Sequence, residues 1–208
     1  MVANSPVYWG QASRGLAAGD AVMARLVARH GDASLVSRGD PFATLARSIV
    51  GQQISVKAAD SVWARLVERL GAVAPASVLR LGATGLAGCG LSQRKIEYLC
   101  DLAAHFDDGR LDPAGWADQD DATLIAELCR VRGIGRWTAE MFLIFNLMRP
   151  DVFPLDDIGL QRAVGEHYLG GEKPSRQVLA DFGERWRPWR SVATWYLWRS
   201  LDPVPVEY

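Results

Sequence analysis

Residues 128–140 read LCRVRGIGRWTAE, which is the apolar end of one helix, a turn with two glycines, and the start of a second helix. Gly133 and Gly135 remove side chains from that turn on either side of Ile134. Backbone amides in such a turn, together with the N-terminus of the next helix, can approach a phosphate closely. A plain connection between two helices would carry the same glycines, so the turn alone leaves both interpretations open.

Helical periodicity extends over most of the chain. From Val56 to Leu70, apolar residues recur at i, i+3, i+4 and i+7, with Ser55 placed to cap the helix and Gly71 to end it. No stretch combines strict alternation with β-branched residues, as a strand would. The sequence therefore predicts an all-α fold. The expected helices cover residues 18–29, 41–50, 56–70, 93–105, 122–129, 137–147, 159–168, 176–185 and 189–200. Residues 71–90, rich in Gly and Ala, are expected to hold short helical pieces and to cross between two helical lobes.

The distribution of charge permits a nucleic-acid partner. The 208 residues carry a net charge of −1, but residues 101–129 hold eight acidic and one basic residue, so the rest of the chain carries +6. We interpret the acidic stretch as a solvated face turned away from such a partner. No apolar run is long enough to cross a bilayer, and residues 1–10 do not resemble a signal peptide. We therefore expect a cytoplasmic protein without a membrane partner.

Cysteine and histidine are sparse and widely spaced. The cysteines are Cys89, Cys100 and Cys129, and the histidines are His30, His105 and His167. None of them shows the paired spacing of a metal site, and we expect the histidines at the surface or at helix ends. Metal and thiol chemistry are therefore not expected.

Flanked by Val131 and by Arg136-Trp137-Thr138-Ala139, the turn resembles the hairpin of the helix-hairpin-helix base-excision DNA glycosylases. This superfamily is named for that hairpin, a Gly/Pro-rich loop and an aspartate. Residues 150–157 read PDVFPLDD and match the loop, and Asp157 follows Gly135 by 22 residues, where the family places its catalytic aspartate. The combination is far more specific than either part.

Further matches resemble the 3-methyladenine DNA glycosylase II type. Residues 42–55, which contain SIVGQQIS at 48–55, are similar to its helix and loop that enter the minor groove. Residues 91–99 are similar to its central helix, and residues 185–198 to its C-terminal helix. The resemblance implies a two-lobed helical fold with the active site in the cleft between the lobes. Residues 1–208 would form one compact domain without the N-terminal β domain of some relatives, with the hairpin at about 122–148. The N- and C-terminal helices would form one lobe and the central helices the other.

The resemblance also implies roles for individual residues. Asp157 is the expected catalytic carboxylate; it can cap the helix starting near Ile158 at the same time, and Asp156 is the less favoured rival. The expected base pocket contains Trp137, Met141 and Trp198, the expected wedge is Gln53 with Gln52 or Ile54, and the expected backbone contacts come from Arg132, Gly133, Ile134, Gly135 and Arg136. Arg132 departs from the family pattern, which usually has proline there.

The expected reaction is removal of alkylated purines, 3-methyladenine and 7-methylguanine, from double-stranded DNA by base flipping. Trp137 stands where relatives that also cut the strand have a lysine, so we expect a monofunctional enzyme that leaves an abasic site. No cofactor is expected, apart from a structural Na⁺ or K⁺ on the carbonyls of Cys129, Val131 and Ile134. We expect a monomer that associates with the nucleoid. Two alternatives are a glycosylase for other damaged bases and a non-catalytic DNA-binding hairpin module.

Overall fold

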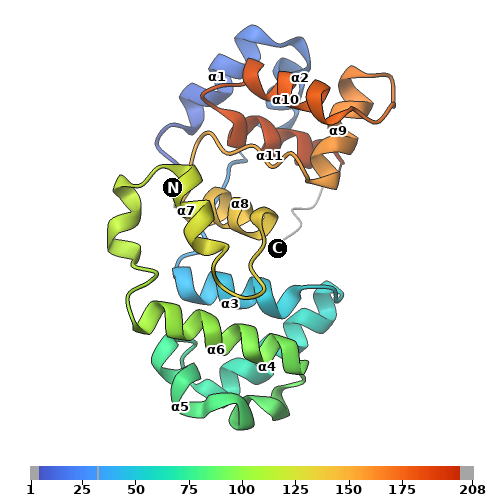
Figure 1. Cartoon of the computed structure of the whole chain (residues 1–208). Coiled ribbons are helices and arrows are strands. Elements are labelled where there is room, and N and C mark those ends of the chain that lie inside the picture. The colour runs from blue at the N-terminus through green and yellow to red at the C-terminus, as the bar shows by residue number, and fades with distance from the viewer. Residues whose placement is uncertain (1–4, 32, 202–208) are drawn as a thin grey trace. The chain divides into compact units, whose positions relative to one another are not determined.

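The computed structural model describes residues 5–31 and 33–201, and every regular element in these ranges is helical (Figure 1). This confirms the predicted all-α fold. The α-helices are α1 (Trp9–Gly19), α2 (Ala21–His30), α3 (Pro41–Gly51), α4 (Val56–Leu70), α5 (Pro75–Leu86), α6 (Gln93–Asp107), α7 (Asp121–Leu128), α8 (Arg136–Phe145), α9 (Ile158–Tyr168), α10 (Arg176–Arg185) and α11 (Arg190–Leu201). Two 3-10 helices, η1 (Ala87–Cys89) and η2 (Pro113–Asp118), lie among them.

The chain divides into two compact units. The first takes the chain up to Ser37 and again from Leu143, and the second is Arg38–Phe142. The first unit therefore contains α1, α2 and α9–α11, and the second contains α3–α7 and most of α8. Residues 71–90 lie wholly inside the second unit, so the prediction that the chain crosses between lobes there is wrong.

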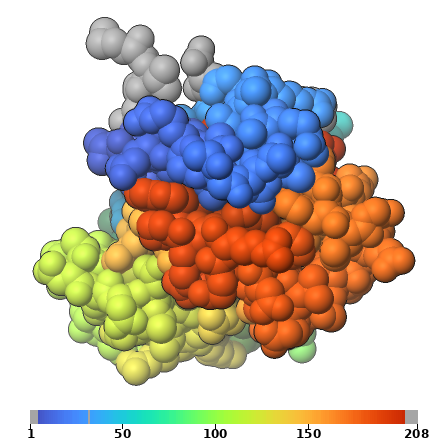
Figure 2. Space-filling model, turned by 90° about the horizontal axis from the view of Figure 1, so that it is seen from above, coloured from blue at the N-terminus to red at the C-terminus, as the bar shows by residue number. Residues whose placement is uncertain are grey.

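Helix α11 is the centre of the first unit. Its residues Ser191–Leu197 are all buried, and the helix contacts α1, α2 and α9. Figure 2 shows the blue N-terminal helices of this unit lying against its red C-terminal segment. Trp9 of α1 meets Trp195 of α11 edge to face, with 5.0 Å between the ring centroids. The last helix of the sequence is thus packed against the first two.

Helix α6 has the corresponding place in the second unit. It contacts α3 and α5, and α4 contacts the same two helices. A row of four rings, Phe42, Phe106, Trp116 and Phe142, runs through the core with successive centroid distances of 5.3, 6.1 and 5.4 Å. All three contacts are edge to face, a geometry that aromatic quadrupoles favour. The row joins α3, α6, η2 and α8.

Short polar side chains determine where the helices begin. Ser55 Oγ accepts from the Ala58 amide at 3.3 Å, and Gly71 ends α4 with a φ of 72°, as predicted. Asp20 accepts from the amides of two residues at the start of α2, at 2.8 and 3.0 Å. That cap separates α1 from α2, so the single helix expected over residues 18–29 is wrong at its start.

The acidic stretch combines exposure with local structural contacts. Most of its carboxylates are exposed, as predicted, and several of them also have structural partners. Asp112 and Asp120 cap η2 and α7, Asp108 pairs with Arg110, and Asp101 accepts from the Arg132 amide. His105 was expected at the surface or at a helix end, and it lies in the last turn of α6; it is 5% exposed, and its Nδ1 lies 2.8 Å from the carbonyl oxygen of Asp101.

Within residues 5–31 and 33–201, no single helix has the length and apolar composition needed to cross a membrane. The segments Val56–Leu70 and Pro75–Cys89 satisfy the same length and composition criteria only when joined across a bend of 103°.

Candidate active site

Asp157 lies at the end of the loop formed by residues 149–157 and is the N-cap of α9. Its Oδ1 accepts two hydrogen bonds, from the Leu160 amide at 2.6 Å and from Trp198 Nε1 at 2.7 Å. The residue is 7% exposed. The predicted capping role is confirmed, and the carboxylate is fixed from two directions, by the backbone of α9 and by the indole of α11.

Trp198 is in turn held by its neighbours in the first unit. Phe145 stacks against it with 5.7 Å between centroids and 12° between the ring planes. A Cβ added to Gly159 would lie 3.2 Å from both Asp157 Oδ1 and Trp198 Cδ1, so the absence of a side chain there permits the close approach. The sequence reasoning missed Phe145. A signal was available, because Trp137, Met141 and Phe145 recur every four residues along α8.

The first turn of α11 anchors the loop that carries Asp157. Arg190 Nε donates to Asp151 Oδ1 at 2.8 Å, and its NH2 donates to the carbonyl oxygen and to Oδ2 of the same residue at 2.7 and 2.9 Å. Ser191 Oγ accepts from the Val152 amide at 2.9 Å, and the Ser191 amide donates to the Pro150 carbonyl at 3.0 Å. Helix α11 therefore holds the loop at its beginning through Arg190 and Ser191 and at its end through Trp198.

Asp156, the rival carboxylate, has a different environment. Its side chain is 57% exposed and forms an ion pair with Arg176 of α10. Exposed pairs of this kind contribute little to stability. The buried, doubly bonded carboxylate next to it is therefore the better candidate for chemistry.

The hairpin geometry differs at its two glycines. Gly133 has a φ of 86°, and a Cβ there would lie 2.2 Å from Cδ2 of Tyr98 on α6. Both the backbone conformation and the packing therefore require glycine. Gly135 is exposed, and a Cβ there would meet nothing within 4 Å. Ile134 between them is buried, so the apolar side chain anchors the turn.

The two hairpin arginines are engaged in ion pairs within the second unit. The Arg132 amide donates to Asp101 Oδ2 at 2.8 Å, and its guanidinium lies 2.9 Å from Glu97. Arg136 pairs at 2.9 Å with Glu140, whose side chain is buried. The charge at Arg132, where the family usually has proline, is thus partly compensated by α6.

The residues expected to form the wedge have different environments. Gln53 is exposed and adopts a left-handed backbone with a φ of 60°. Ile54 is 40% exposed. Gln52 is half-buried, and its Nε2 donates to the Gly133 carbonyl oxygen at 2.8 Å. The geometry favours Gln53 and Ile54 over Gln52 as the inserting side chains, because the amide of Gln52 is already bonded to the hairpin.

The expected pocket residues are divided between the units. Asp157 and Trp198 meet within the first unit, while Trp137 and Met141 belong to the second. Trp137 is 37% exposed, which is high for a tryptophan, and Met141 one turn later is 6% exposed. Among the described residues there is no group of three or more His, Cys, Asp or Glu side chains that could hold a metal ion.

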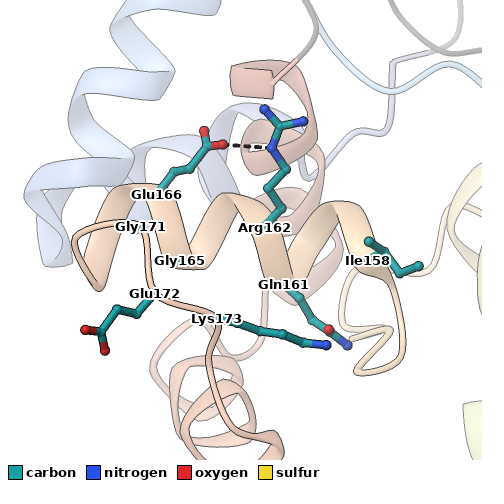
Figure 3. Close-up of a pocket in the computed structure, with 8 residues that line it drawn as sticks. All are labelled: Ile158, Gln161, Arg162, Gly165, Glu166, Gly171, Glu172 and Lys173. Carbon is teal, nitrogen blue, oxygen red and sulfur yellow. Dashed lines mark hydrogen bonds and ion pairs between the residues drawn. The ribbon is translucent and has the colours of Figure 1, made fainter.

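A surface hollow of about 360 Å³ lies along α9, beyond Asp157 (Figure 3). It is lined by Ile158, Gln161, Arg162, Gly165, Glu166, Gly171, Glu172 and Lys173. Arg162 pairs with Glu166 at 2.7 Å, and Gln161 Nε2 donates to the Leu155 carbonyl at 3.0 Å. The charges are of both signs, so the hollow identifies no class of ligand.

The structure thus combines a glycine hairpin, a proline-bracketed loop that ends in a buried carboxylate, and an indole bonded to that carboxylate. The model of the family described as "HhH-GPD superfamily base excision DNA repair protein" matches residues 46–188. The chain belongs to this superfamily.

Solved structures support the assignment. The chain is similar to a DNA-3-methyladenine glycosidase from Bacillus halodurans, with a TM-score of 0.86, 35% identity, and coverage of 92% of this chain and 89% of that one. It is also similar to the Schizosaccharomyces pombe 3-methyladenine DNA glycosylase in complex with abasic DNA, with a TM-score of 0.79, 29% identity, and coverage of 94% and 100%.

A curated relative extends beyond the matched region. The DNA-3-methyladenine glycosylase of Bacillus subtilis is 31% identical over 174 residues, which are 78% of this chain and 57% of that protein. The chain thus spans less than two thirds of this relative's length.

Proposed function

We propose that the chain hydrolyses the N-glycosidic bond of alkylated purines, chiefly 3-methyladenine and 7-methylguanine, in double-stranded DNA. The observation that carries the proposal is the Asp157 carboxylate, buried at a helix N-terminus with Leu160 and Trp198 both bonded to Oδ1. Relatives named for this activity, at 29–35% identity, support it.

We assign to Asp157 the stabilisation of positive charge. Hydrogen bonds from an indole and an amide orient its carboxylate at the N-terminus of α9. Cleavage of the glycosidic bond develops oxocarbenium character at the sugar, which such a carboxylate stabilises while it orients the attacking water. An N3- or N7-alkylated purine already carries positive charge and leaves readily, so little acid assistance is needed.

Extrusion of the damaged nucleotide costs a few kcal/mol and must be offset by contacts to the protein. We assign the wedge to Gln53 and Ile54 and the phosphate contact to the amides near the exposed Gly135. Trp198, next to Asp157 in the first unit, is proposed to bind the base, because an aromatic face attracts a cationic purine by about 0.5–2 kcal/mol. For Trp137 and Met141, which belong to the second unit, the contact with the base stays a prediction from the family resemblance. The protein would act as a monomer.

A monovalent cation is proposed at the hairpin, on the carbonyls of Cys129, Val131 and Ile134. Val131 already accepts from the Ile134 amide at 3.1 Å, and a carbonyl has a second lone pair for a cation. No side chain is needed for this site, so it is compatible with the lack of an acidic cluster among the described residues.

The decisive experiment measures release of free 3-methyladenine and 7-methylguanine from methylated duplex DNA by wild type and by Asp157→Asn. Release by wild type alone, with DNA binding retained in the variant, supports hydrolysis through Asp157. Equal behaviour of both proteins, with binding and no release, would instead support a non-catalytic hairpin module.

A second measurement tests for strand cleavage. Trp137 offers no amine for a Schiff base, so we expect nicks only after alkali treatment and no borohydride-trapped adduct. A trapped adduct would contradict the monofunctional mechanism.

A further inference from the structure

Lys95 of α6 binds the loop that follows α3. Its Nζ donates to the carbonyl oxygens of Val50 and Gln52 at 2.7 and 2.8 Å. These carbonyls lie at the C-terminal end of α3, where helix carbonyls lack partners within the helix and the dipole is negative. An ammonium group that donates to both satisfies the helix end and fixes the backbone immediately before Gln53.

The same loop is bonded to the hairpin. Gln52 Nε2 donates to the Gly133 carbonyl oxygen at 2.8 Å, across 81 residues of sequence. Gln53 follows in a left-handed conformation that a non-glycine residue adopts at a cost of about 1–2 kcal/mol. Such a conformation persists where surrounding contacts determine it. The contacts here are the hydrogen bonds from Lys95 Nζ to the two backbone carbonyls and the hydrogen bond from the side-chain amide of Gln52 to Gly133.

Helix α6 contacts the hairpin as well. Tyr98 packs against Gly133, and Asp101 Oδ2 accepts from the Arg132 amide at 2.8 Å. Lys95, Tyr98 and Asp101 are three residues apart in succession, which places them along one side of the helix. A single helix therefore supports both the loop with Gln53 and the hairpin with Gly133.

We propose that Lys95 and Gln52 are positioning residues that hold the loop with Gln53 at a fixed position relative to the hairpin. Binding of a DNA phosphate by the hairpin and insertion of Gln53 would then occur together. The inference rests on the proposed function, because it assigns insertion to Gln53. A loop released from these bonds would still be close to DNA, but it would no longer be organised to occupy the space left by an extruded base. Displacement of a group by about 1 Å costs up to 100-fold in a reaction that depends on orientation.

The test compares Lys95→Met and Gln52→Ala with wild type and with Arg94→Met. Arg94 is exposed on the same turn of α6, so its substitution removes a neighbouring positive charge without removing the carbonyl bonds. Affinity is measured for undamaged duplex and for duplex with a tetrahydrofuran abasic-site analogue, between about 50 and 200 mM salt. Fluorescence of 2-aminopurine beside the analogue reports unstacking.

We expect Lys95→Met and Gln52→Ala to lose about tenfold or more of the preference for the abasic-site duplex and most of the fluorescence change. Their affinity for undamaged duplex and its salt dependence should equal those of wild type, and Arg94→Met should keep the preference. Gln52→Ala removes only one half-buried amide, so it keeps the test decisive if Lys95→Met unfolds.

A uniform loss of affinity for both duplexes in Lys95→Met, with a salt slope smaller by about one, would overturn the inference, because it would show that Lys95 contacts a phosphate directly. Retained preference in Gln52→Ala would also overturn it. If wild type prefers the abasic-site duplex but releases no alkylated base, the proposed substrate fails while the binding data still decide the inference. A wild type without this preference would overturn the inference, while release of alkylated bases would still decide the proposed function.

Discussion

Trp198 Nε1 donates a hydrogen bond of 2.7 Å to Asp157 Oδ1, although 41 residues separate the two in sequence. Asp157 caps α9 and Trp198 lies on α11 of the same unit, and the bond directs a neutral donor at the carboxylate that the proposed reaction uses. A hydrogen bond to a charged group contributes about 1.5–3 kcal/mol.

Trp198→Phe keeps a ring for stacking on Phe145 and removes the N–H donor. We expect the single-turnover rate of 7-methylguanine release to fall about 10- to 100-fold, because the carboxylate loses part of its orientation. Trp195→Phe is the matched control, since Trp195 lies on the same helix but packs against Trp9. An unchanged rate in Trp198→Phe would show that the Leu160 amide alone suffices to orient Asp157.

The two hairpin glycines should respond differently to alanine. Gly133→Ala forces a side chain into a left-handed conformation and against Tyr98, and we expect the free energy of unfolding to fall by about 2–4 kcal/mol. Gly135→Ala meets open space, so the melting temperature should stay the same while affinity for duplex DNA falls. Melting curves and DNA titrations measure the two effects; full affinity in Gly135→Ala would exclude close phosphate contact at that residue.

Asp151 and Asp156 lie in the loop that ends at Asp157, and their asparagine variants allow a matched comparison of a residue that anchors the loop with one that is exposed. Asp151→Asn weakens the bonds to Arg190, whose side chain is only 17% exposed, and should lower the free energy of unfolding by about 1–3 kcal/mol. Base release should slow as well, because the loop loses one of its anchors. Asp156→Asn disrupts an exposed pair and should change neither quantity measurably. Equal urea denaturation curves for the two variants would contradict this account.

Stability should decrease as the pH falls below the ordinary histidine range. Burial lowers the pKa of both His30 and His167 from the usual 6.5. Nearby arginines lower it further, while Glu166 partly opposes the shift of the His167 pKa. The unfolded chain therefore binds more protons than the folded chain near and below this pH, so the free energy of unfolding rises with pH through this window.

Urea denaturation between about pH 7.5 and 5 measures this slope. Carboxylates titrate mainly below this range and therefore contribute little to the slope. His167→Gln should reduce the slope. The account fails if neither His167→Gln nor His30→Gln changes it.

The helices that sequence periodicity defined best are those with both an apolar stripe and a cap. Helix α4 begins after Ser55 and ends before Gly71 as expected, and α10 covers Arg176–Arg185 as expected. Helix α1 was missed, because its burial depends on partners such as Trp195, which are far away in sequence. The break at Asp20 was overlooked because a single capping residue interrupts an otherwise continuous apolar pattern.

The candidate site shows a similar division. The family resemblance indicated Asp157 as the candidate carboxylate through its spacing to the hairpin glycines. Its capping role, which the structure shows, could be predicted from the residue type and the helix that follows. The bonds from Lys95 and Gln52 could not be predicted, because both use backbone carbonyls, which every residue has. The pairing of Asp151 with Arg190 was missed for another reason, since 39 residues separate oppositely charged side chains that each had several other candidate partners.

The order of the two units along the sequence also determines the order in which they can fold during synthesis. The second unit is one uninterrupted stretch, Arg38–Phe142, whereas the first needs α1 and α2 to be joined by α9–α11. A nascent chain emerging from the ribosome therefore has every partner of the hairpin-bearing unit before α11 is made. Helices α1 and α2 cannot complete their packing until α11, whose buried surface they cover, has been synthesised. A chain that stops before α11 would carry the hairpin and Asp157, but it would lack Trp198, Arg190 and Ser191 to hold that carboxylate and its loop in place.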